Sequence, residues 1–558
     1  MGLNGGLNAP KEIFFQGCHL AVSEPSRVVT MLRASHEARN HTSRKEGTMK
    51  AERWRGAAVA AIVASLAAAA VAANGQEGFG NNNNGGNENR RKARNVIFFV
   101  GDGMGVSTIS AARVFSVGVA GQLVVDQFPY TALSRTYSSD SITPDSAPTM
   151  SAMMTGVNTN QSVIGFGEST EPNDFNNDGD GQASWTLLEL AKARGMNVGV
   201  VSTAQITHAT PAATYAHINQ RNNENDIALQ ALPGDPTYNQ RLGSGVDILM
   251  GGGRRFFVPA GVLDEEGGAG SRTDGRNLRA EFQAAGYTYV WNQAGFNALT
   301  AASLPVLGLF ERGHMEYEHD RPTDLGGEPS VAEMTVKSIQ WLEQSRRRGS
   351  GGYFLMVEGG RIDHAHHEGN AYRALTDTQA LDEAIGAAAQ MVDLRDTLII
   401  VSADHSHVFN IAGYPMRPLQ ELPYPVNSYA PGYANAGGHG HGILDVVYDL
   451  DQSTGHVSES PDRNGVPYTI LGYHNGPGYR GTPRVDPRTD PFPGRNGLIP
   501  NGPWDQAYFQ EAAVPLSSET HSGEDVAIYA VGPGAELVRG TVKNTHIFHV
   551  MKKALGLN

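Results

Sequence analysis

Four short runs of almost entirely apolar residues, spread over the chain, constrain its fold more than any other feature. They lie at 96–100, 198–201, 353–357 and 397–401, and segments with helical spacing lie between them. Such runs are typical of parallel strands that are covered on both faces. We therefore predict an α/β fold with three layers, α/β/α, built on a large and mostly parallel central sheet.

Polar side chains that can bind metals or do chemistry follow each of the four runs. They lie at Asp102, 202–208, 358–367 and 404–405. In an open α/β sheet, ligands bind outside the carboxyl ends of the strands, so these segments are predicted to converge on one crevice. Carboxylates and imidazoles, which are concentrated in 358–367, are ligands that suit zinc and magnesium. A solvated loop is the alternative, but it would have no reason to recur after every strand.

The first part of the chain does not have the pattern of a folded domain. A basic start, an alanine-rich apolar stretch and small residues after it are typical of a secretory signal peptide, here 49–73. Its apolar stretch of about 15 residues is shorter than the roughly 20 that span a bilayer, which argues against a membrane anchor. We expect translation from Met49, with 1–48 as an over-extended start, and export to the periplasm or the medium.

Composition limits the partners of the exported chain. Residues 74–94 are rich in Asn and Gly and are expected to form a disordered linker. The single cysteine, Cys18, precedes the signal, so stability must come from the core and the metals. Nine of the 43 Lys and Arg and five of the 57 Asp and Glu lie before residue 74, which leaves a formal net charge of −18. We expect neither nucleic-acid binding nor a membrane span in the mature chain.

The C-terminal part changes in character. Residues 409–520 are rich in Gly, Pro, Tyr and Asn and show few long periodic runs, so we interpret them as a loop-rich insertion carried on the main sheet. A further strand is predicted at 526–531 and a closing helix at 546–555. Residues 95–558 would then form one domain that contains the insertion.

Six short motifs make the chain similar to the alkaline phosphatases. In family order they are 100–105 (VGDGMG), 145–147 (DSA), 208–211 (HATP), 358–367 (EGGRIDHAHH), 402–407 (SADHSH) and 520–525 (THSGED). Each motif is weak alone, but six in register are specific. The resemblance covers residues 95–555 and implies the alkaline phosphatase fold with a crown-like insertion. It also implies a catalytic domain that hydrolyses phosphate monoesters through a phosphoserine intermediate.

The same resemblance implies a site with two zinc ions and one magnesium ion. Its ligands would be carboxylates, imidazoles and one hydroxyl: Asp363, His367 and His521 for the first zinc, Asp102, Asp404 and His405 for the second, and Asp102, Thr210 and Glu358 for the magnesium. Asp102 would thus bridge two metals. Asp363 and His367 are four residues apart, a spacing that places them on one face of a helical turn.

Ser146 would be the nucleophile. A serine hydroxyl is a poor nucleophile at neutral pH, and metal coordination is one of the few ways to activate it. Residues 147–156 are predicted to form a short helix, whose first backbone N–H groups favour phosphate oxygens. An ordinary helix cap at Asp145 and Ser146 is the alternative interpretation. Arg221 matches the arginine that clamps two phosphate oxygens with its planar guanidinium.

Three positions differ among branches of the family. His208 and His364 agree with animal members, whereas some bacterial members have aspartate and lysine there. Neither is expected to be a direct ligand, and both would tune magnesium affinity and phosphate release from outside the ligand set. Pro144 stands where many members have threonine.

Two further features resemble animal members. The segment 309–311 (LFE) is similar to one that carries a calcium site, for which Glu311 and Glu328 could serve. The segment 468–479 resembles the crown segment at the dimer interface, so a homodimer is expected. The expected small-molecule partners are phosphate monoesters and inorganic phosphate.

Two alternatives stand beside this interpretation. A phosphodiesterase or sulfatase of the same superfamily is one, but sulfatases need a Cys/Ser-x-Pro-x-Arg motif and 146–150 (SAPTM) lacks the arginine. A clamp by Arg221 also favours a terminal phosphate over a diester. The other is an exported phosphate- or metal-binding protein without turnover. Such a protein would be expected to lose Ser146 or a ligand of the first zinc, and all of these residues are present.

Overall fold

A computed structural model describes most of the chain after residue 91. The described residues are 92–173, 181–347, 351–417, 428–429, 442–463, 465–480 and 502–557. The predicted start 1–48, the signal peptide 49–73 and nearly all of the linker 74–94 lie outside them, as do parts of the insertion 409–520.

The central sheet is large and mostly parallel, as predicted. Its ten strands, in spatial order, are β18 (Thr541–Lys543), β2 (Tyr130–Arg135), β17 (Val526–Val531), β8 (Thr397–Ala403), β1 (Asn95–Gly101), β7 (Tyr353–Gly359), β3 (Asn197–Gln205), β4 (Ile248–Gly252), β6 (Val306–Leu309) and β5 (Thr288–Val290). Among these described strands, β17 alone runs antiparallel to its neighbours. The four runs read from the sequence are the central strands β8, β1, β7 and β3.

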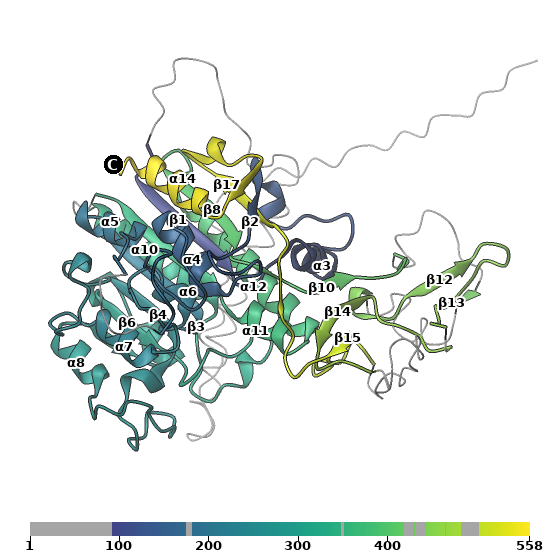
Figure 1. The fold of residues 1–558 in the computed structure, drawn as a ribbon, viewed down its shortest axis with the longest axis horizontal. Coiled ribbons are helices and arrows are strands. Elements are labelled where there is room, and N and C mark those ends of the chain that lie inside the picture. Colours follow the sequence, from purple (N-terminus) through teal and green to yellow (C-terminus); the bar gives the residue numbers. More distant parts are fainter. Residues whose placement is uncertain are drawn as a thin grey trace, which may run out of the picture. The chain divides into compact units, whose positions relative to one another are not determined.

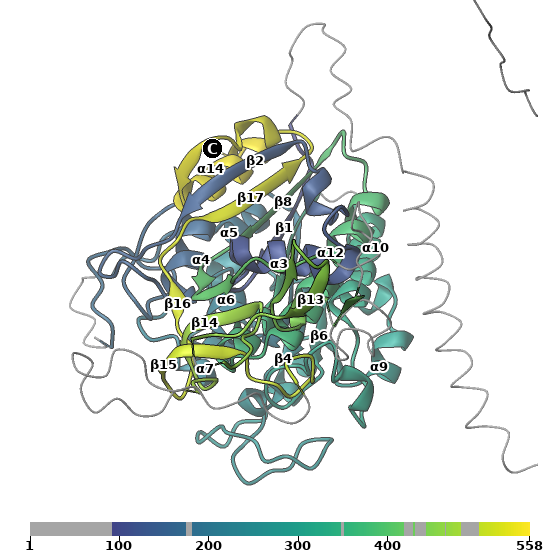
Figure 2. The same ribbon diagram turned by 90° about the vertical axis from the view of Figure 1, so that its right-hand side faces the viewer.

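Both faces of the sheet are covered, which explains why the strands are apolar throughout. In β1, Val96, Phe98 and Val100 belong to one core, Ile97 and Phe99 belong to the other, and all five are 0% exposed. The first core includes residues of α4 (Ser146–Thr155), α5 (Leu187–Ala193) and α14 (Thr545–Leu555). The second includes residues of α3 (Val106–Val117), α10 (Val331–Arg347) and α12 (Ala371–Met391), on the opposite side of the strands in Figure 2. The predicted three-layer α/β/α fold is confirmed.

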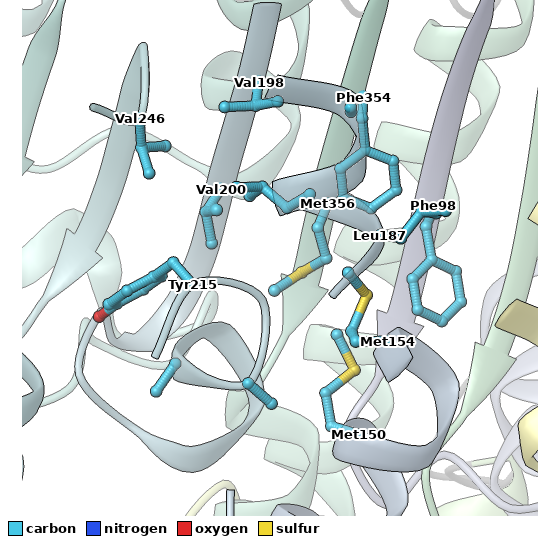
Figure 3. Packing of buried hydrophobic residues seen from close by; sticks show 14 of the residues in the cluster. Phe98, Met150, Met154, Leu187, Val198, Val200, Tyr215, Val246, Phe354 and Met356 are labelled. Carbon is cyan, nitrogen blue, oxygen red and sulfur yellow. The ribbon is translucent and has the colours of Figure 1, made fainter. Parts of the chain in front are cut away.

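The first core connects the sheet to the helix that begins at Ser146. Figure 3 shows Met150 and Met154 of α4 beside Phe98 of β1 and Met356 of β7. Met153 is also buried, so the three methionines of this helix fill the core. Packing of α4 against β1 therefore fixes the start of α4 relative to the end of β1.

The carboxyl ends of the central strands lie in register. Gly101 at the end of β1 pairs with Gly359 of β7 and with Ala403 of β8. Ser202 of β3 pairs with Glu358 of β7. The polar residues that follow the strands are thus brought to one edge of the sheet, as the sequence predicted.

The described part of the insertion forms short strands. One small sheet contains β10 (Phe409–Ile411), β14 (Leu471–Gly476) and β15 (Glu511–Pro515), and another contains β11 (Ser428–Tyr429), β13 (His456–Glu459) and β12 (Tyr448–Asp451). Figure 1 shows β12 and β13 away from the central sheet. A third pair, β9 (Ser406–His407) with β16 (His521–Ser522), joins two of the sequence motifs. Among the residues that the structure describes, none of the helices is long and apolar enough to cross a membrane.

Replacing a core residue of β1 tests whether the side chains of this strand are buried in the core. Phe98→Ala is expected to lower the free energy of unfolding by about 3–5 kcal/mol, because it removes a fully buried ring and leaves a cavity. Leu133→Ala in β2 is the control, since Leu133 is 39% exposed, and its cost should stay below about 1 kcal/mol. Urea unfolding followed by fluorescence measures both, and equal costs would contradict the assignment of Phe98 to the core.

Candidate active site

Three buried carboxylates lie where the central strands end. Asp102 follows β1, Glu358 is near the end of β7 and Asp404 follows β8, and they are 0%, 0% and 2% exposed. Burial is the main cause that raises the pKa of Asp102 well above its usual value, and the charge of Asp404 adds to it. Carboxylates are rarely buried together unless cations offset their charge, so this edge of the sheet is suited to bind cations.

Ser146 is the first residue of α4 and lies beside this group. Its Oγ lies 3.2 Å from His405 Nε2 and donates a hydrogen bond of 3.5 Å to Asp102 Oδ1. The cap of α4 is the side chain of Asp145, which accepts a hydrogen bond of 2.7 Å from Ala147 N. The helix-cap interpretation therefore holds for Asp145, and it leaves the Ser146 hydroxyl available for chemistry.

Asp363, His367 and His521 form the first group of converging ligand atoms. The Nε2 atoms of His367 and His521 lie 3.4 and 3.3 Å from Asp363 Oδ1 and 3.1 Å from each other. Each imidazole directs its Nδ1 at a backbone carbonyl, His367 at Glu519 O and His521 at Pro144 O. A carbonyl only accepts, so Nδ1 carries the proton and the Nε2 lone pairs face each other, an arrangement that suits a shared metal ion.

His407 belongs to the same group but was not assigned a role from the sequence. Its Nε2 lies 2.9 Å from Asp363 Oδ1, and its Nδ1 lies 2.6 Å from Glu519 Oε2. Although burial opposes it, contact with the two carboxylates raises the pKa of His407 to about 9. Burial would raise the pKa of Asp363, but His367 and His407 hold that pKa well below its usual value. The position of His407 in the motif 402–407 was the available signal, whereas its partner Glu519 lies far along the chain.

Asp102, Asp404 and His405 form the second predicted group. His405 Nε2 lies 3.3 Å from Asp102 Oδ1 and 3.3 Å from Asp404 Oδ2. Asp404 Oδ1 accepts hydrogen bonds from the backbone N–H groups of Gly103 and His405. Its other oxygen, Oδ2, is buried and accepts no hydrogen bond from the residues that the structure describes. One carboxylate oxygen is thus held by the backbone, and the other is left for a cation.

The third predicted group joins Asp102, Thr210 and Glu358. Thr210 Oγ1 donates a hydrogen bond of 3.3 Å to Asp102 Oδ2, and Ser202 Oγ donates one of 2.5 Å to Glu358 Oε2. Glu358 Oε1 is buried with no hydrogen-bond partner within the described ranges. Burial raises the pKa of Glu358 to about 8. Oxygen ligands with an unsatisfied carboxylate oxygen fit a hard cation such as magnesium.

Arg221 contacts Asp145, the residue before Ser146, and His208. Its Nη1 lies 3.4 Å from Asp145 Oδ1, and its Nη2 lies 2.7 Å from His208 Nε2. The guanidinium is therefore held between the cap of α4 and an imidazole, which limits the directions that its planar donors can take.

His208 and His364 lie next to each other and to His314, which was not predicted from the sequence to belong to the site. The ring centroids of His208 and His364 are 5.5 Å apart, and that of His314 is 4.1 Å from His364. His314 Nδ1 accepts a hydrogen bond from Gln205 N, and His364 Nδ1 lies 3.1 Å from Arg361 Nη1. Burial holds the pKa values of His208 and His364 well below the usual range, so both rings are neutral.

Comparison with known proteins identifies the family. The family model for alkaline phosphatase matches residues 93–557. The chain belongs to the alkaline phosphatase family. It is a phosphomonoesterase. One similar protein is the tissue-nonspecific alkaline phosphatase of Gallus gallus, which is 37% identical over 83% of this chain and 84% of that protein. The alkaline phosphatase of Gadus morhua is 35% identical over 83% of this chain and 92% of that protein.

Solved structures of alkaline phosphatases have the same fold. The structure of the enzyme from Thermus thermophilus aligns with 85% of this chain over 94% of its own chain, with a TM-score of 0.57 and 26% sequence identity. The enzyme from the Antarctic bacterium TAB5 matches 84% of this chain and all of its own, with a TM-score of 0.55 and 22% identity. The second likeness supports the fold alone.

The predicted calcium residues of this alkaline phosphatase lie in a separate acidic region. Glu311 groups with Glu266 and Asp324, which offer oxygens within 4.8 Å of one another. Glu328 is 2% exposed and accepts a hydrogen bond of 2.9 Å from Glu316 N, while its Oε2 has no hydrogen-bond partner among the described residues. Burial, with the charge of Glu311 second, raises the pKa of Glu328 to about 9. From the sequence, Glu311 and Glu328 were predicted as calcium ligands, but Glu266 and Asp324 were not.

Replacing His407 tests its contact with the first ligand group. His407→Gln is expected to weaken metal binding at this group by about 10- to 100-fold, because Asp363 Oδ1 loses its contact of 2.9 Å with the His407 imidazole. Competition with a chromogenic chelator measures the affinity. His474→Gln, at an exposed histidine of β14, is the matched control and should bind metal like the wild type. Equal affinities for both variants would show that His407 does not orient Asp363.

Proposed function

We propose that this alkaline phosphatase transfers the phosphoryl group of a monoester to Ser146 and then to water, at a site that holds two zinc ions and one magnesium ion. The observation that carries the proposal is the position of the Ser146 hydroxyl at the start of α4, in contact with Asp102 and His405. A nucleophile in this position lies beside the ligand groups and at the N-terminus of a ten-residue helix.

The metals are proposed from the chemistry of the ligand sets. Asp363, His367 and His521 would hold one zinc ion, and Asp102, Asp404 and His405 the other; Asp102, Thr210 and Glu358 would hold magnesium. One oxygen of Asp404 and one of Glu358 accept no hydrogen bond from the described residues, which supports this assignment, as do the facing lone pairs of the two imidazoles. When bound, these ions would lower the pKa of coordinated hydroxyl groups and offset the charge of the phosphate.

Each side chain at the site would have its own role in phosphoryl transfer. Ser146 Oγ gives up its proton and attacks phosphorus in line with the leaving oxygen; the bond between phosphorus and that oxygen breaks, and the oxygen takes up a proton to leave as an alcohol. This forms a phosphoserine, which water hydrolyses to serine and inorganic phosphate. Arg221 would donate two hydrogen bonds to oxygens of the phosphate, and the first backbone N–H groups of α4 would face them. A phosphate monoester leaves more oxygens free for this clamp than a diester does.

The neutral imidazoles would tune this chemistry without binding metal directly. His208 contacts Arg221 and therefore limits how the guanidinium turns when phosphate leaves. His364 is held by Arg361 and packs against His208. Both would affect magnesium affinity and phosphate release through the groups that they contact.

A calcium ion, export and a homodimer complete the proposal. Glu311 with Glu266 and Asp324 supplies oxygen ligands of the kind that calcium prefers, and Glu328 lies close enough to affect their charge.

Export to the periplasm or the medium is supported by the apolar segment within 49–73. The homodimer rests on the similarity of 468–479 to the crown segment of animal members.

Removal of metal tests the ligand assignment. Protein produced from Met49 and treated with EDTA is expected to lose hydrolysis of an aryl phosphate and to recover it when zinc and magnesium are added. The metal-free protein should also unfold at lower temperature, because buried carboxylates lose the cations that offset their charge. A steady-state assay and thermal unfolding measure the two effects. Activity that is indifferent to chelation would refute the metal assignment.

Replacing the nucleophile tests the intermediate. Ser146→Ala is expected to lower kcat by roughly three orders of magnitude or more, since no hydroxyl is left to accept the phosphoryl group. Acid quenching during turnover should trap phosphate covalently on the wild-type protein but not on this variant. Ser139→Ala, at an exposed serine in the preceding loop, is the control and should keep full activity. Phosphate trapped on the alanine variant would place the nucleophile elsewhere.

A further inference from the structure

The half-buried side chain of Gln161 contacts the backbone on both sides of Pro144. Gln161 Oε1 accepts a hydrogen bond of 2.7 Å from Asp145 N, and Nε2 donates one of 3.1 Å to Thr143 O. Because one partner can only donate and the other only accept, a single orientation of the amide satisfies both. The backbone N of Gln161 also donates to Asp140 Oδ1. The residue therefore holds the loop before Ser146 at three points.

The loop held by Gln161 also contacts the rest of the site. The carbonyl of Pro144 accepts the hydrogen bond that fixes the tautomer of His521, and the side chain of Asp145 both caps α4 and lies 3.4 Å from Arg221. Pro144 has no N–H with which to anchor itself, so the loop depends on contacts to the residues on either side. Gln161 supplies one contact on each side, to Thr143 O and to Asp145 N, beside those that Ser141, Thr149 and Ser162 make to the same two residues.

The neighbouring residue connects this loop to the arginine. Ser162 N donates a hydrogen bond of 2.9 Å to Asp145 Oδ2, and Ser162 O accepts one of 2.8 Å from Arg221 N. Ser162 has a φ of 65°, in the left-handed region that a serine adopts only when its surroundings impose it. The backbone at 161–162 is thus fixed between the loop of the nucleophile and the backbone of the phosphate clamp.

We propose that Gln161 is a positioning residue for phosphoryl transfer, which sets the relative placement of Ser146 and Arg221 through the loop around Pro144. The assignment rests on the proposed function, because it concerns the distance between the attacking hydroxyl and the bound phosphate. Loss of the amide would leave the loop around Pro144, with its contact to His521, free to shift while the carboxylates at the ends of the central strands stay in place. A displacement of about 1 Å at a reacting atom can cost up to about a hundredfold in rate.

The neighbouring Asn160 provides a matched control. It is also half-buried and its Nδ2 makes two hydrogen bonds, but these run to the carbonyls of Glu168 and Thr170 and not to the loop before Ser146. Asn160→Ala and Gln161→Ala each remove two side-chain hydrogen bonds from the same segment, so their losses of stability should be similar. Only the Gln161 variant should disturb the site. Gln161→Met keeps the volume of the side chain without its hydrogen bonds. It therefore distinguishes the effect of the lost hydrogen bonds from the effect of lost packing.

The experiment compares the four proteins by kcat for an aryl phosphate, by equilibrium binding of inorganic phosphate and by thermal unfolding. Gln161→Ala and Gln161→Met are expected to lower kcat by about tenfold or more and to weaken phosphate binding several-fold. Asn160→Ala should stay within about twofold of the wild type in both, at a comparable unfolding temperature.

Two results would overturn the assignment. If Asn160→Ala lost as much kcat as Gln161→Ala, the segment would matter only for stability. If Gln161→Met kept wild-type kcat and phosphate binding, the side chain would act by filling space. A wild-type protein without hydrolysis would instead contradict the proposed function, so the two failures are distinguishable.

Discussion

Four buried carboxylates, Asp102, Glu358, Asp363 and Asp404, meet at the carboxyl edge of the central sheet, and the local structure depends on how their charge is satisfied. Backbone N–H groups, the Ser202 hydroxyl and imidazoles satisfy some of their oxygens, but Asp404 Oδ2 and Glu358 Oε1 accept no hydrogen bond within the described part of the chain. An isolated carboxylate in an apolar interior would be protonated or would destabilise the fold. The arrangement is therefore stable in its ionised form only with cations, which ties folding of this edge to metal binding.

The sheet determines which segments can share those cations. The strands β8, β1, β7 and β3 are neighbours in space although they come from four separate parts of the chain. Their pairing in register places the residues after each strand at the same height, so short loops suffice to bring the ligands together. A rigid, doubly covered sheet can hold such groups more closely than loops alone could.

Features that follow from local pattern, from the geometry of parallel sheets or from the family motifs were predictable from the sequence, and other side-chain pairs between distant segments were not. The apolar runs predicted the central strands because both faces are buried, and the spacing of Asp363 and His367 predicted their shared helical face. The pairing of His407 with Glu519 joins residues 112 positions apart, and no local pattern encodes it. The reversed direction of β17 and the grouping of Glu266 with Glu311 were missed for the same reason.

The segment 409–520, which the sequence predicts to be an insertion, contributes contacts to the site. Glu519, at its end, contacts His407, and the Tyr473 hydroxyl of β14 lies 2.8 Å from His366 Nδ1. Tyr473 and Glu519 are 3% and 1% exposed, and their partners are also buried. Separating the insertion from the sheet would leave these polar groups buried and unpaired, at a cost of about 1–3 kcal/mol for each neutral group and more for a charged one. The orientation of Asp363 is therefore coupled to the folding of the insertion through His407 and Glu519.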